Sequence, residues 1–320
     1  MAEISVLLST YNESIEDIKN AINSILEQTF TDFELIIVND NPDNKLIIDY
    51  LDTIKNKKNV KVIYNKENIG LANCMNKAYK IASGKYIARM DADDISVSNR
   101  FERQIELMKT GIYDLVCTNF HFIDTKNQIL DKKHRDYSGL TLEKAIFRGN
   151  VIHHPTVMMT REIFEKVGGY RDFPCSQDYD LWLRMAEIGA KFYLLNEDLL
   201  GYRIREESVS NKRSMYQIAT LYYIKFLSNE RRKKSKDSYS LENYQDFLKK
   251  IDVSAQYEEK YLEAKDLISY FKDMLKKKRF IKAILLLREA VAMHKLIIHE
   301  FWFISKFVVY LKINGENKYV

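Results

Sequence analysis

The sequence contains few residues of the kinds that interrupt or cross-link a chain. Only three of its 320 residues are proline, which argues against a long flexible linker. The three cysteines, Cys74, Cys117 and Cys175, are scattered and lack metal-ligand spacing, so we expect reduced thiols in a reducing compartment. The first residues show no charged-then-apolar signal segment, and no stretch of about 18 uncharged apolar residues exists, which excludes a conventional membrane span.

Two nucleotide-binding motifs are also missing. The sequence contains no G-x-G-x-x-G and no G-x-x-x-x-G-K-[ST], so neither a dinucleotide redox cofactor nor a P-loop nucleoside triphosphate is favoured. The composition is that of a globular protein, with 46% hydrophobic and 12% aromatic residues. The net charge of +5 conceals an asymmetry, because residues 211–320 hold 23 basic and 13 acidic residues, or +10, and the first 210 residues carry −5. The two parts are therefore expected to meet different partners.

Apolar runs alternate with amphipathic segments over the first hundred residues. The runs that predict buried strands lie at residues 4–8, 33–38, 60–64 and 86–90. The helices predicted between them lie at residues 15–26, 46–54 and 71–82. This alternation is typical of an α/β fold with an open, doubly wound, mostly parallel sheet and helices on both faces. The polar loops after the strands would then share one edge of the sheet, which brings Thr10, Tyr11 and Glu13 near Asp40 and Asp91.

Three carboxylates follow the fourth predicted strand directly, at Asp91, Asp93 and Asp94. An acidic cluster at the end of a buried strand favours the binding of a cation. Mg²⁺ and Mn²⁺ bind through one or two protein carboxylates and complete their coordination shell with water and substrate phosphate. We therefore expect a ligand with a diphosphate group to bind the cation together with the protein. The alternative is a solvated acidic turn that caps a helix beginning near Ser98.

Five segments resemble, in order and spacing, family 2 glycosyltransferases of the GT-A fold. They are VLLSTYN at residues 6–12, LIIVND at 35–40, NIGLA at 68–72, ASGKYI at 82–87 and MDADD at 90–94. Three later segments resemble the acceptor-side segments of the same enzymes. They are NVIHHPT at 150–156, VGGY at 167–170 and QDYDLWLR at 177–184. The resemblance implies a GT-A domain over residues 1–210, with a nucleotide-sugar-binding half at 1–105 and an acceptor-side half at 106–210, followed by a helical C-terminal region.

The resemblance implies that the first two loops hold the nucleotide. Thr10, Tyr11 and Asp40 would bind the uracil of a UDP-sugar, with Glu13 in the same loop. This is chemically reasonable, because a carboxylate accepts from an imide N–H and a tyrosine ring stacks on a base. Asp91 completes this set as the residue that would contact the ribose or the metal.

The resemblance further implies that Asp93 holds Mn²⁺ or Mg²⁺ against the diphosphate, where the cation neutralises the leaving group. His154 is a further candidate metal ligand, and His153 a candidate contact to the acceptor or diphosphate. For both histidines the alternative is a hydrogen-bonded core residue.

In the family a carboxylate ahead of a helix removes the proton from the acceptor hydroxyl, and Asp178 occupies that place. Members with this arrangement invert configuration in a single displacement, so a β-type linkage is expected from an α-linked donor. The alternative is that Asp178 or Asp180 is a plain helix cap. Gln177 stands where the family usually has glutamate, which removes a nearby negative charge and predicts a shifted pH optimum. The same departure motivates a second hypothesis, a catalytically impaired module that only binds the nucleotide-sugar.

Three further side chains are candidates for contacts to the acceptor or the diphosphate, namely Gln177, Trp182 and Arg203. Gln177 can position a ligand by hydrogen bonds. The ring of Trp182 could form the floor of a sugar-binding site, but Trp182 also fits a helix face buried in the core. Arg203 either reaches the diphosphate or is a solvated charge.

The Gln-x-x-Arg-Trp segment of processive synthases is absent after Trp182, which favours transfer of one sugar at a time. The resemblance implies a UDP-sugar donor, a hexosyl- or N-acetylhexosaminyltransferase, and a lipid-linked or oligosaccharide acceptor of capsule, O-antigen or exopolysaccharide type. It also implies a cytoplasmic protein on the inner face of the cell membrane. A nucleotidyltransferase, which also uses an acidic metal site, would need a second carboxylate set and a basic glycine-rich loop that are not evident.

Residues 211–320 predict a basic, amphipathic helical region, interrupted by a loop rich in Lys, Arg and Ser at 228–240. In the segment 276–311 a basic cluster precedes a narrow polar stripe on a wide apolar face, which suits a helix lying on an anionic membrane surface. The alternative is a helical pair packed on the catalytic domain or on a second subunit, as in a homodimer. Nucleic-acid binding is not expected, since the lysines accompany a large apolar face.

Overall fold

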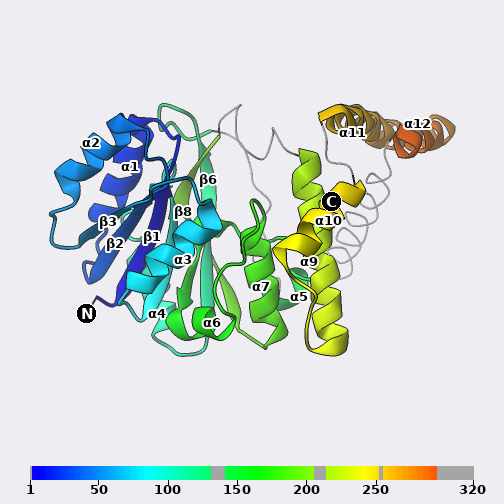
Figure 1. Ribbon diagram of the computed structural model, residues 1–320. Coiled ribbons are helices and arrows are strands. Elements are labelled where there is room, and N and C mark those ends of the chain that lie inside the picture. Colours follow the sequence, from blue (N-terminus) through cyan, green and yellow to red (C-terminus); the bar gives the residue numbers. More distant parts are fainter. Residues whose placement is uncertain (1, 131–140, 205–213, 252–254, 294–320) are drawn as a thin grey trace. The chain divides into compact units, whose positions relative to one another are not determined.

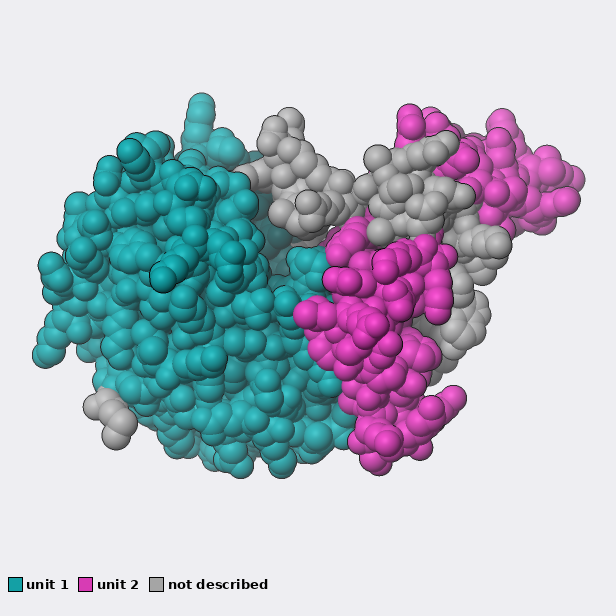
Figure 2. Space-filling model, in the orientation of Figure 1, with its two compact units in different colours: residues 1–205 teal, residues 206–320 magenta. Residues whose placement is uncertain are grey.

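The computed structural model, shown in Figure 1, describes residues 2–130, 141–204, 214–251 and 255–293. The chain divides into two compact units, Met1–Arg205 and Glu206–Val320, which Figure 2 colours separately. The domain boundary predicted at residue 210 lies outside the described residues.

Unit 1 is built on one eight-stranded sheet in the order β3-β2-β1-β4-β7-β6-β8-β5. The strands are β1 (Ile4–Thr10), β2 (Phe33–Asn39), β3 (Val60–Tyr64), β4 (Tyr86–Asp91), β5 (Ile95–Ser96), β6 (Leu115–Ile123), β7 (Met158–Thr160) and β8 (Phe192–Arg203). The helices are α1 (Ile15–Leu26), α2 (Lys45–Ile54), α3 (Leu71–Ile81), α4 (Arg100–Met108), α5 (Leu142–Ala145), α6 (Arg161–Lys166) and α7 (Gln177–Glu187), with a 3₁₀ turn η1 (His154–Thr156).

The sheet is mixed. The first four strands pair in parallel, β7 runs antiparallel to both of its neighbours, and β8 pairs parallel with β6. Because β7 is antiparallel to β4 and to β6, strands β6 and β8 run the same way as β1, β2 and β4. The predicted α/β class is confirmed, and the prediction of a mostly parallel sheet holds for the nucleotide-side half. The periodicity indicated only the first four strands, so β5 to β8 were not predicted, among them the short strands β5 and β7 that pair antiparallel with their neighbours.

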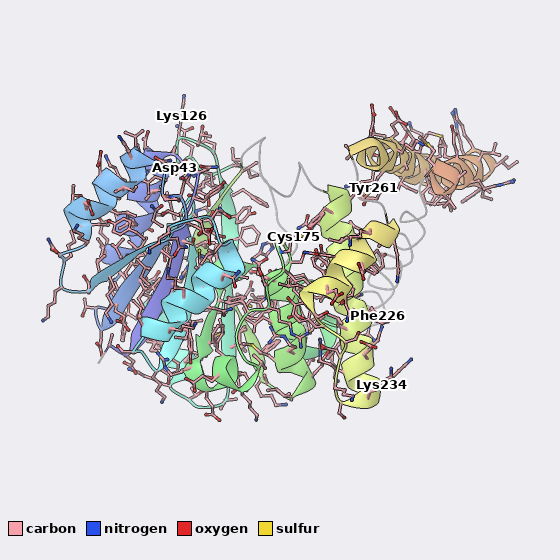
Figure 3. The ribbon with its side chains drawn as sticks, viewed as in Figure 1. Asp43, Lys126, Cys175, Phe226, Lys234 and Tyr261 are labelled. Atoms are coloured by element: carbon pink, nitrogen blue, oxygen red, sulfur yellow. The ribbon has the colours of Figure 1, made fainter. Side chains whose placement is uncertain are left out.

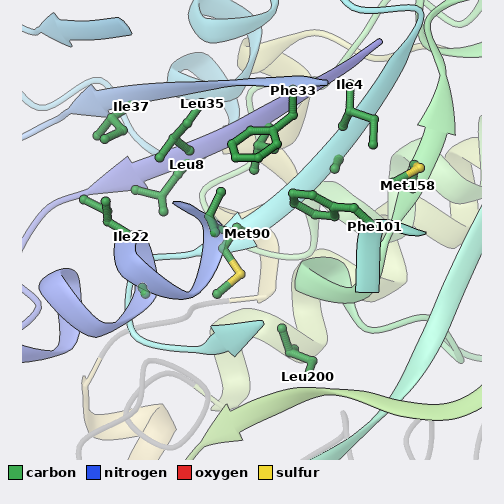
Figure 4. Packing of buried hydrophobic residues seen from close by; sticks show 14 of the residues in the cluster. Ile4, Leu8, Ile22, Phe33, Leu35, Ile37, Met90, Phe101, Met158 and Leu200 are labelled. Carbon is green, nitrogen blue, oxygen red and sulfur yellow. The ribbon is translucent and has the colours of Figure 1, made fainter. Parts of the chain in front are cut away.

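Hydrophobic burial on both faces explains why the first strands form. Every residue of β2 is buried, as expected for a parallel strand covered on both sides. One face packs on α1, α2 and α4 in the core drawn in Figure 4, which includes Ile22 of α1 and Phe101 of α4. Helices α3 and α6 meet through the rings of Tyr79 and Phe164, 4.4 Å apart, and lie together in front of the sheet in Figure 1.

The common strand direction brings several loops to one edge of the sheet. Strands β1, β2, β4, β6 and β8 all end there, which is where ligands bind in open α/β sheets. Figure 3 labels Asp43 after β2 and Lys126 after β6, and both lie at this edge. Cys175 marks the loop ahead of α7 in the same figure. We call the edge of the sheet at which β1, β2, β4, β6 and β8 end the carboxyl edge.

Unit 2, where it is described, consists of helices. They are α9 (Ser214–Lys234), α10 (Leu241–Ile251), α11 (Ala255–Lys276) and α12 (Phe280–Met293). Helix α9 continues through residues 228–234, so the loop predicted from residue 228 is wrong for these positions. Lys and Arg are good helix formers, and the helix ends just before Ser235, whose φ is 60°.

The C-terminal part of the segment predicted to lie on a membrane, residues 294–311, is outside the described residues. Of the helices that the structure does describe, none has the length and apolar character needed to cross a bilayer.

Candidate active site

The acidic loop at the end of β4 concentrates negative charge at the carboxyl edge. The Asp91 side chain is 31% exposed and forms an ion pair with the buried guanidinium of Arg89. Asp94 is buried, and its Oδ1 accepts a hydrogen bond from the Arg203 backbone N–H at 2.9 Å. Burial, followed by the carboxylates of Asp91 and Asp93, raises the pKa of Asp94 well above its ordinary value. Asp94 is therefore part of the interior of the loop and does not cap a helix.

Arg203 holds the acidic loop from strand β8. Its Nε donates to Asp93 O at 2.7 Å and forms an ion pair with Asp17 Oδ1 at 3.1 Å. Its terminal nitrogens donate to Asp124 O and to Asn127 Oδ1, each at 2.5 Å. The side chain is 0% exposed, which contradicts both the expected diphosphate contact and the solvated alternative. The sequence could not distinguish these cases, because the partners of Arg203 come from three other segments.

The acidic loop suits a hard divalent cation. The part of the chain that the structure describes contains no group of three or more His, Cys, Asp or Glu side chains placed to hold a metal ion. Mg²⁺ and Mn²⁺, however, need only one or two protein carboxylates when water and phosphate fill their other positions. Asp94 Oδ2 is buried and has no hydrogen-bond partner among the described residues. The charges of Asp91 and Asp93 raise the pKa of Asp94, and a bound cation would offset this repulsion. These residues fit a cation that binds together with a phosphorylated ligand.

Asp178 lies in the first turn of α7. Its carboxylate is partly exposed, and Oδ2 accepts a hydrogen bond from Asn150 Nδ2 at 2.9 Å. Burial raises the pKa of Asp178, the Asn150 bond lowers it, and the charge of Asp91 raises it again. The net direction is upward, toward the range in which a carboxylate works as a general base at neutral pH.

Asp180, the other acid of this helix, has a different environment. Its side chain is 0% exposed and forms ion pairs with Arg184 at 2.8 Å and with Arg171 at 3.8 Å. Arg184 also donates to the carbonyl oxygen atoms of Val167 and Gly169. Asp180 is therefore a structural anchor of α7, which leaves Asp178 as the acid of this pair that faces the carboxyl edge.

Gln177, the first residue of α7, is buried. The negative charge that a glutamate would bring to this position is absent. The pKa of Asp178 is nevertheless raised, because burial is the largest influence on it and Asp91 supplies a nearby carboxylate. The departure at Gln177 thus does not remove the electrostatic conditions for a base.

The loop after β1 presents one exposed aromatic ring. Tyr11 is 43% exposed, and its backbone N–H donates to Glu13 Oε2 at 2.7 Å. Glu13 thus shapes the loop that carries the ring. The Thr10 hydroxyl is buried and donates to Asn39 Oδ1 at 3.1 Å, which ties the ends of β1 and β2 together. Of the aromatic and hydroxyl side chains predicted here, Tyr11 has the exposed one.

Asp40 orders the loop that enters α3. Its Oδ1 accepts from Asn65 Nδ2 at 2.7 Å and from Ile69 N at 2.9 Å, and its Oδ2 accepts from Gly70 N at 2.9 Å. The residue is 3% exposed. These bonds fix the Asp40 carboxylate within the protein and leave Oδ2 with one accepted bond, so a direct contact between Asp40 and a uracil stays a prediction. The sequence placed Asp40 at the right edge, but it did not show that both carboxylate oxygens would be used within the protein.

The two histidines of the HHP segment have different surroundings. His154 is buried, and its Nε2 lies 2.7 Å from the Tyr170 hydroxyl. Burial and the Arg89 charge hold the pKa of His154 well below its ordinary value. Its ring is used inside the protein, which contradicts the expected metal contact. His153 is exposed at the carboxyl edge, with its ring 4.1 Å from that of Phe120.

Trp182 lies in the core. It is 0% exposed, and its ring is 6.1 Å from that of His154. The predicted acceptor contact is therefore wrong, and the alternative of a buried helix face is confirmed. The position of α7 explains this, because every residue from Tyr179 to Met185 is buried, so the middle of the helix has no face open to a ligand.

Tyr202 is the site residue that sequence reasoning missed. Burial raises the pKa of its hydroxyl, and so do the carboxylates of Asp94, Asp91, Asp93 and Asp178, in that order. All four carboxylates therefore lie close enough to Tyr202 for their charges to raise the pKa of its hydroxyl. The missed signal was an aromatic residue at the carboxyl end of a strand, directly before the candidate residue Arg203.

A buried charge in a strand was a second missed signal. Arg89 is 1% exposed within β4, and charged residues are rarely buried without a partner. Its partner is Asp91, two positions later on the same strand face. Arg89 thus limits the freedom of the Asp91 carboxylate.

Comparison with known proteins finds similar sequences. Residues 5–168 match the sequence profile of the family described as Glycosyl transferase family 2. The chain is similar to an uncharacterized glycosyltransferase of Methanocaldococcus jannaschii, with 37% identity over 225 residues, covering 68% of this chain and 78% of that protein. It is also similar to the O-antigen biosynthesis glycosyltransferase WbnJ of Escherichia coli, with 31% identity over 226 residues, covering 69% of this chain and 87% of that protein.

Solved structures share the fold. The crystal structure of S. aureus TarS 1–349 in complex with UDP-GlcNAc superposes with a TM-score of 0.57 at 18% identity, covering 77% of this chain and 70% of that chain. The match spans 42% of the longer TarS chain. At this identity the likeness concerns the fold alone, and it confirms the predicted GT-A architecture.

Proposed function

Because the chain belongs to glycosyl transferase family 2, we propose that it transfers one sugar at a time from a UDP-sugar to an acceptor hydroxyl with inversion of configuration. The observation that carries the proposal is that the acidic loop after β4 and Asp178, in the first turn of α7, lie at the carboxyl edge. The charges of these acids together raise the pKa of Tyr202. In the proposal, the loop holds the diphosphate and Asp178 is the base.

In this proposal Asp178 takes the proton of the acceptor hydroxyl. The hydroxyl oxygen attacks the anomeric carbon from the face opposite the phosphate, a carbon–oxygen bond forms, and the bond to the diphosphate breaks as UDP leaves. A base with a raised pKa is suited to accept this proton near neutral pH. Inversion follows from the single displacement.

The loop residues would hold the donor. Tyr11 would stack on the uracil, with Glu13 and Thr10 fixing the loop around it. Asp93, with Asp91 beside it, would hold Mn²⁺ or Mg²⁺. When bound, such a cation offsets the negative charge that develops on the departing diphosphate. Asp94 and Arg203 support this loop from inside, and they are not ligands in the proposal.

The acceptor is proposed from the relatives. One of them is named for O-antigen biosynthesis and another for teichuronic acid biosynthesis. We therefore propose a hydroxyl of a growing cell-surface glycan, carried on a lipid or present as an oligosaccharide, and a hexosyl or N-acetylhexosaminyl donor. The exposed His153 is proposed to contact the acceptor.

Removal of the metal tests the donor site. We expect UDP to bind the wild-type protein at least about tenfold more tightly with Mn²⁺ or Mg²⁺ than with EDTA, a difference of about 1.4 kcal/mol. The Asp93→Asn variant should lose most of this difference, because it lacks the carboxylate that holds the cation. Calorimetric titration with UDP measures both, and a panel of UDP-sugars then identifies the donor by UDP release.

The matched control is Asp52→Asn, which changes an exposed acid of α2 that pairs with Lys55. This variant should keep the metal dependence of UDP binding. Equal UDP affinity of the wild type with metal and with EDTA would contradict the proposed metal site. Metal-dependent UDP binding without turnover of any donor would favour the module that only binds the nucleotide-sugar.

We further propose that α12 rests on an anionic membrane surface, at the inner face of the cell membrane. Its outer face carries Phe280, Ile281, Ile284 and Leu285, which are 60%, 80%, 58% and 57% exposed. Ala283 and Ala290, on the other side, are buried. Exposed basic residues precede and flank this apolar face, namely Lys277, Lys278, Arg279, Lys282 and Arg288. Apolar anchors beside cations fit a bilayer of acidic lipids.

Vesicle flotation tests this surface. The wild-type protein should bind vesicles that contain phosphatidylglycerol and bind pure phosphatidylcholine weakly, and Ile281→Asn with Leu285→Asn should reduce binding several-fold. Leu46→Asn on α2, which changes a leucine that is 69% exposed in unit 1, is the control and should bind like wild type. If the paired variant binds vesicles normally but changes the mass from dimer to monomer in light scattering, the apolar face belongs to a homodimer.

A further inference from the structure

Asn150 and Asp178 come from separate segments and meet at the carboxyl edge. Asn150 Nδ2 donates to Asp178 Oδ2 at 2.9 Å. The other end of the same amide is also engaged, because Asn150 Oδ1 accepts from the Ile152 backbone N–H at 3.3 Å. An N–H group can only donate, so the bond to Ile152 requires the oxygen of the amide on that side. The NH₂ group must then face Asp178.

The group that donates a hydrogen bond to the Asp178 carboxylate, the Asn150 amide, is uncharged. An arginine or lysine in this position would lower the pKa of the carboxylate strongly and weaken it as a base. The Asn150 amide is the strongest of the influences that lower the pKa of Asp178, but it does not outweigh burial. The carboxylate therefore has a fixed direction and keeps its basicity. Asn150 itself is exposed, so the bond is not needed to satisfy a buried amide.

We propose that Asn150 is a positioning residue for the reaction, which orients the Asp178 carboxylate toward the acceptor hydroxyl. The inference rests on the proposed role of Asp178 as the base. It also connects that base to the backbone of the segment that carries His153, since Ile152 is the residue before it. A ligand that shifts this segment would move the Asn150 amide, and with it the direction of the carboxylate.

The titration of Asp178 is a readout that a merely structural role would not move. The groups that interact with its charge are Asp91 of β4, Tyr170, Tyr179 of α7 and Tyr202 of β8. The carboxyl carbon of Asp178 can be followed by NMR in protein labelled at aspartate, and its signal is identified by its loss in Asp178→Asn. This measurement does not require a known donor.

Asn150→Ala should move the titration of Asp178 upward by about one to two pH units, as expected for loss of a hydrogen bond to a charged group. Asn150→Asp keeps an acceptor for the Ile152 N–H but places a carboxylate beside Asp178, so the shift should be larger. Once a donor is known, the acidic limb of the transfer rate should move by the same amount, with the KM for the donor unchanged.

Asn196→Ala is the control, because Asn196 is an exposed asparagine whose Oδ1 accepts from Asn119 Nδ2 at 2.7 Å, away from Asp178. It should leave the titration unchanged. If Asp178 titrates at the same pH in wild type and in Asn150→Ala, the inference is wrong, whether or not the protein transfers sugar. A shifted titration without transfer from any donor would refute the proposed function instead, and with it the role of Asn150 in positioning a catalytic base.

Discussion

Replacement of Asp178 by asparagine should lower the rate of sugar transfer by about 10²- to 10⁴-fold, the usual contribution of a general base. Asparagine has nearly the same shape, and its carbonyl oxygen can still accept from Asn150 Nδ2. What the variant lacks is a group that can take the proton of the acceptor. UDP affinity and the unfolding midpoint should therefore stay close to those of the wild type.

Asp180→Asn is the variant to compare with Asp178→Asn. It changes an acid two positions away that is 0% exposed and paired with Arg184, so it should lower the stability of unit 1 and leave the folded protein able to transfer sugar. Transfer rates and chemical denaturation, measured on both variants, separate the two roles. A normal rate for Asp178→Asn would exclude it as the base.

The pH dependence of the wild type follows from the same site. The pKa of Asp178 is raised in the folded protein, and only its ionised form can accept a proton. The rate of sugar transfer should therefore be highest above the pKa of Asp178 and should fall as the pH decreases through that pKa. The loss should begin at a higher pH than the ordinary aspartate value of 3.8 would give, which a profile of transfer rate against pH measures.

Replacement of Arg203 by methionine should destabilise unit 1 by about 3–5 kcal/mol, the cost of breaking a buried ion pair by removing one partner. Methionine keeps much of the side-chain volume, so the loss reflects the bonds to Asp17, Asp93 O, Asp124 O and Asn127. The midpoint of denaturation by urea measures this change.

Arg103→Met is the matched control. Arg103 also forms ion pairs, with Glu197 and Glu106, but its side chain is 39% exposed. Exposed pairs of this kind contribute about 0–1 kcal/mol. If Arg203→Met were as stable as the wild type and lost only affinity for UDP, Arg203 would be a diphosphate contact and would not be the internal support of the acidic loop.

The sequence predicted those parts of the fold that depend on local patterns. Continuous apolar runs in β1 and β2 indicate strands covered on both faces. The strands continue past the predicted ends at residues 8 and 38, to Thr10 and Asn39 at the carboxyl edge. Since strand direction places the loops, the pattern of strands and helices was enough to locate the acids Asp91 and Asp93 at that edge. The antiparallel insertion of β7 depends on pairing between distant segments, which local periodicity does not contain.

The roles of individual polar side chains were harder to predict, because they depend on which groups meet across the fold. Asp40 was expected to bind the uracil, and Arg203 either to reach the diphosphate or to be a solvated charge. Both side chains bond to backbone and side-chain partners from other segments, which the sequence did not indicate. His154 and Trp182 lie in the interior for the same reason. Tyr202 received no role from the sequence, although the charges of all four acids raise the pKa of its hydroxyl.

Base-assisted displacement at the anomeric carbon determines the anomeric configuration of the product, which makes that configuration the decisive observation. The wild-type protein would be incubated with the UDP-sugar it turns over and an acceptor, and the new linkage examined by the proton coupling constant at the anomeric position. We predict a β linkage from an α-linked donor. An α linkage would contradict the proposed mechanism, because retention of configuration cannot arise from a single displacement assisted by Asp178.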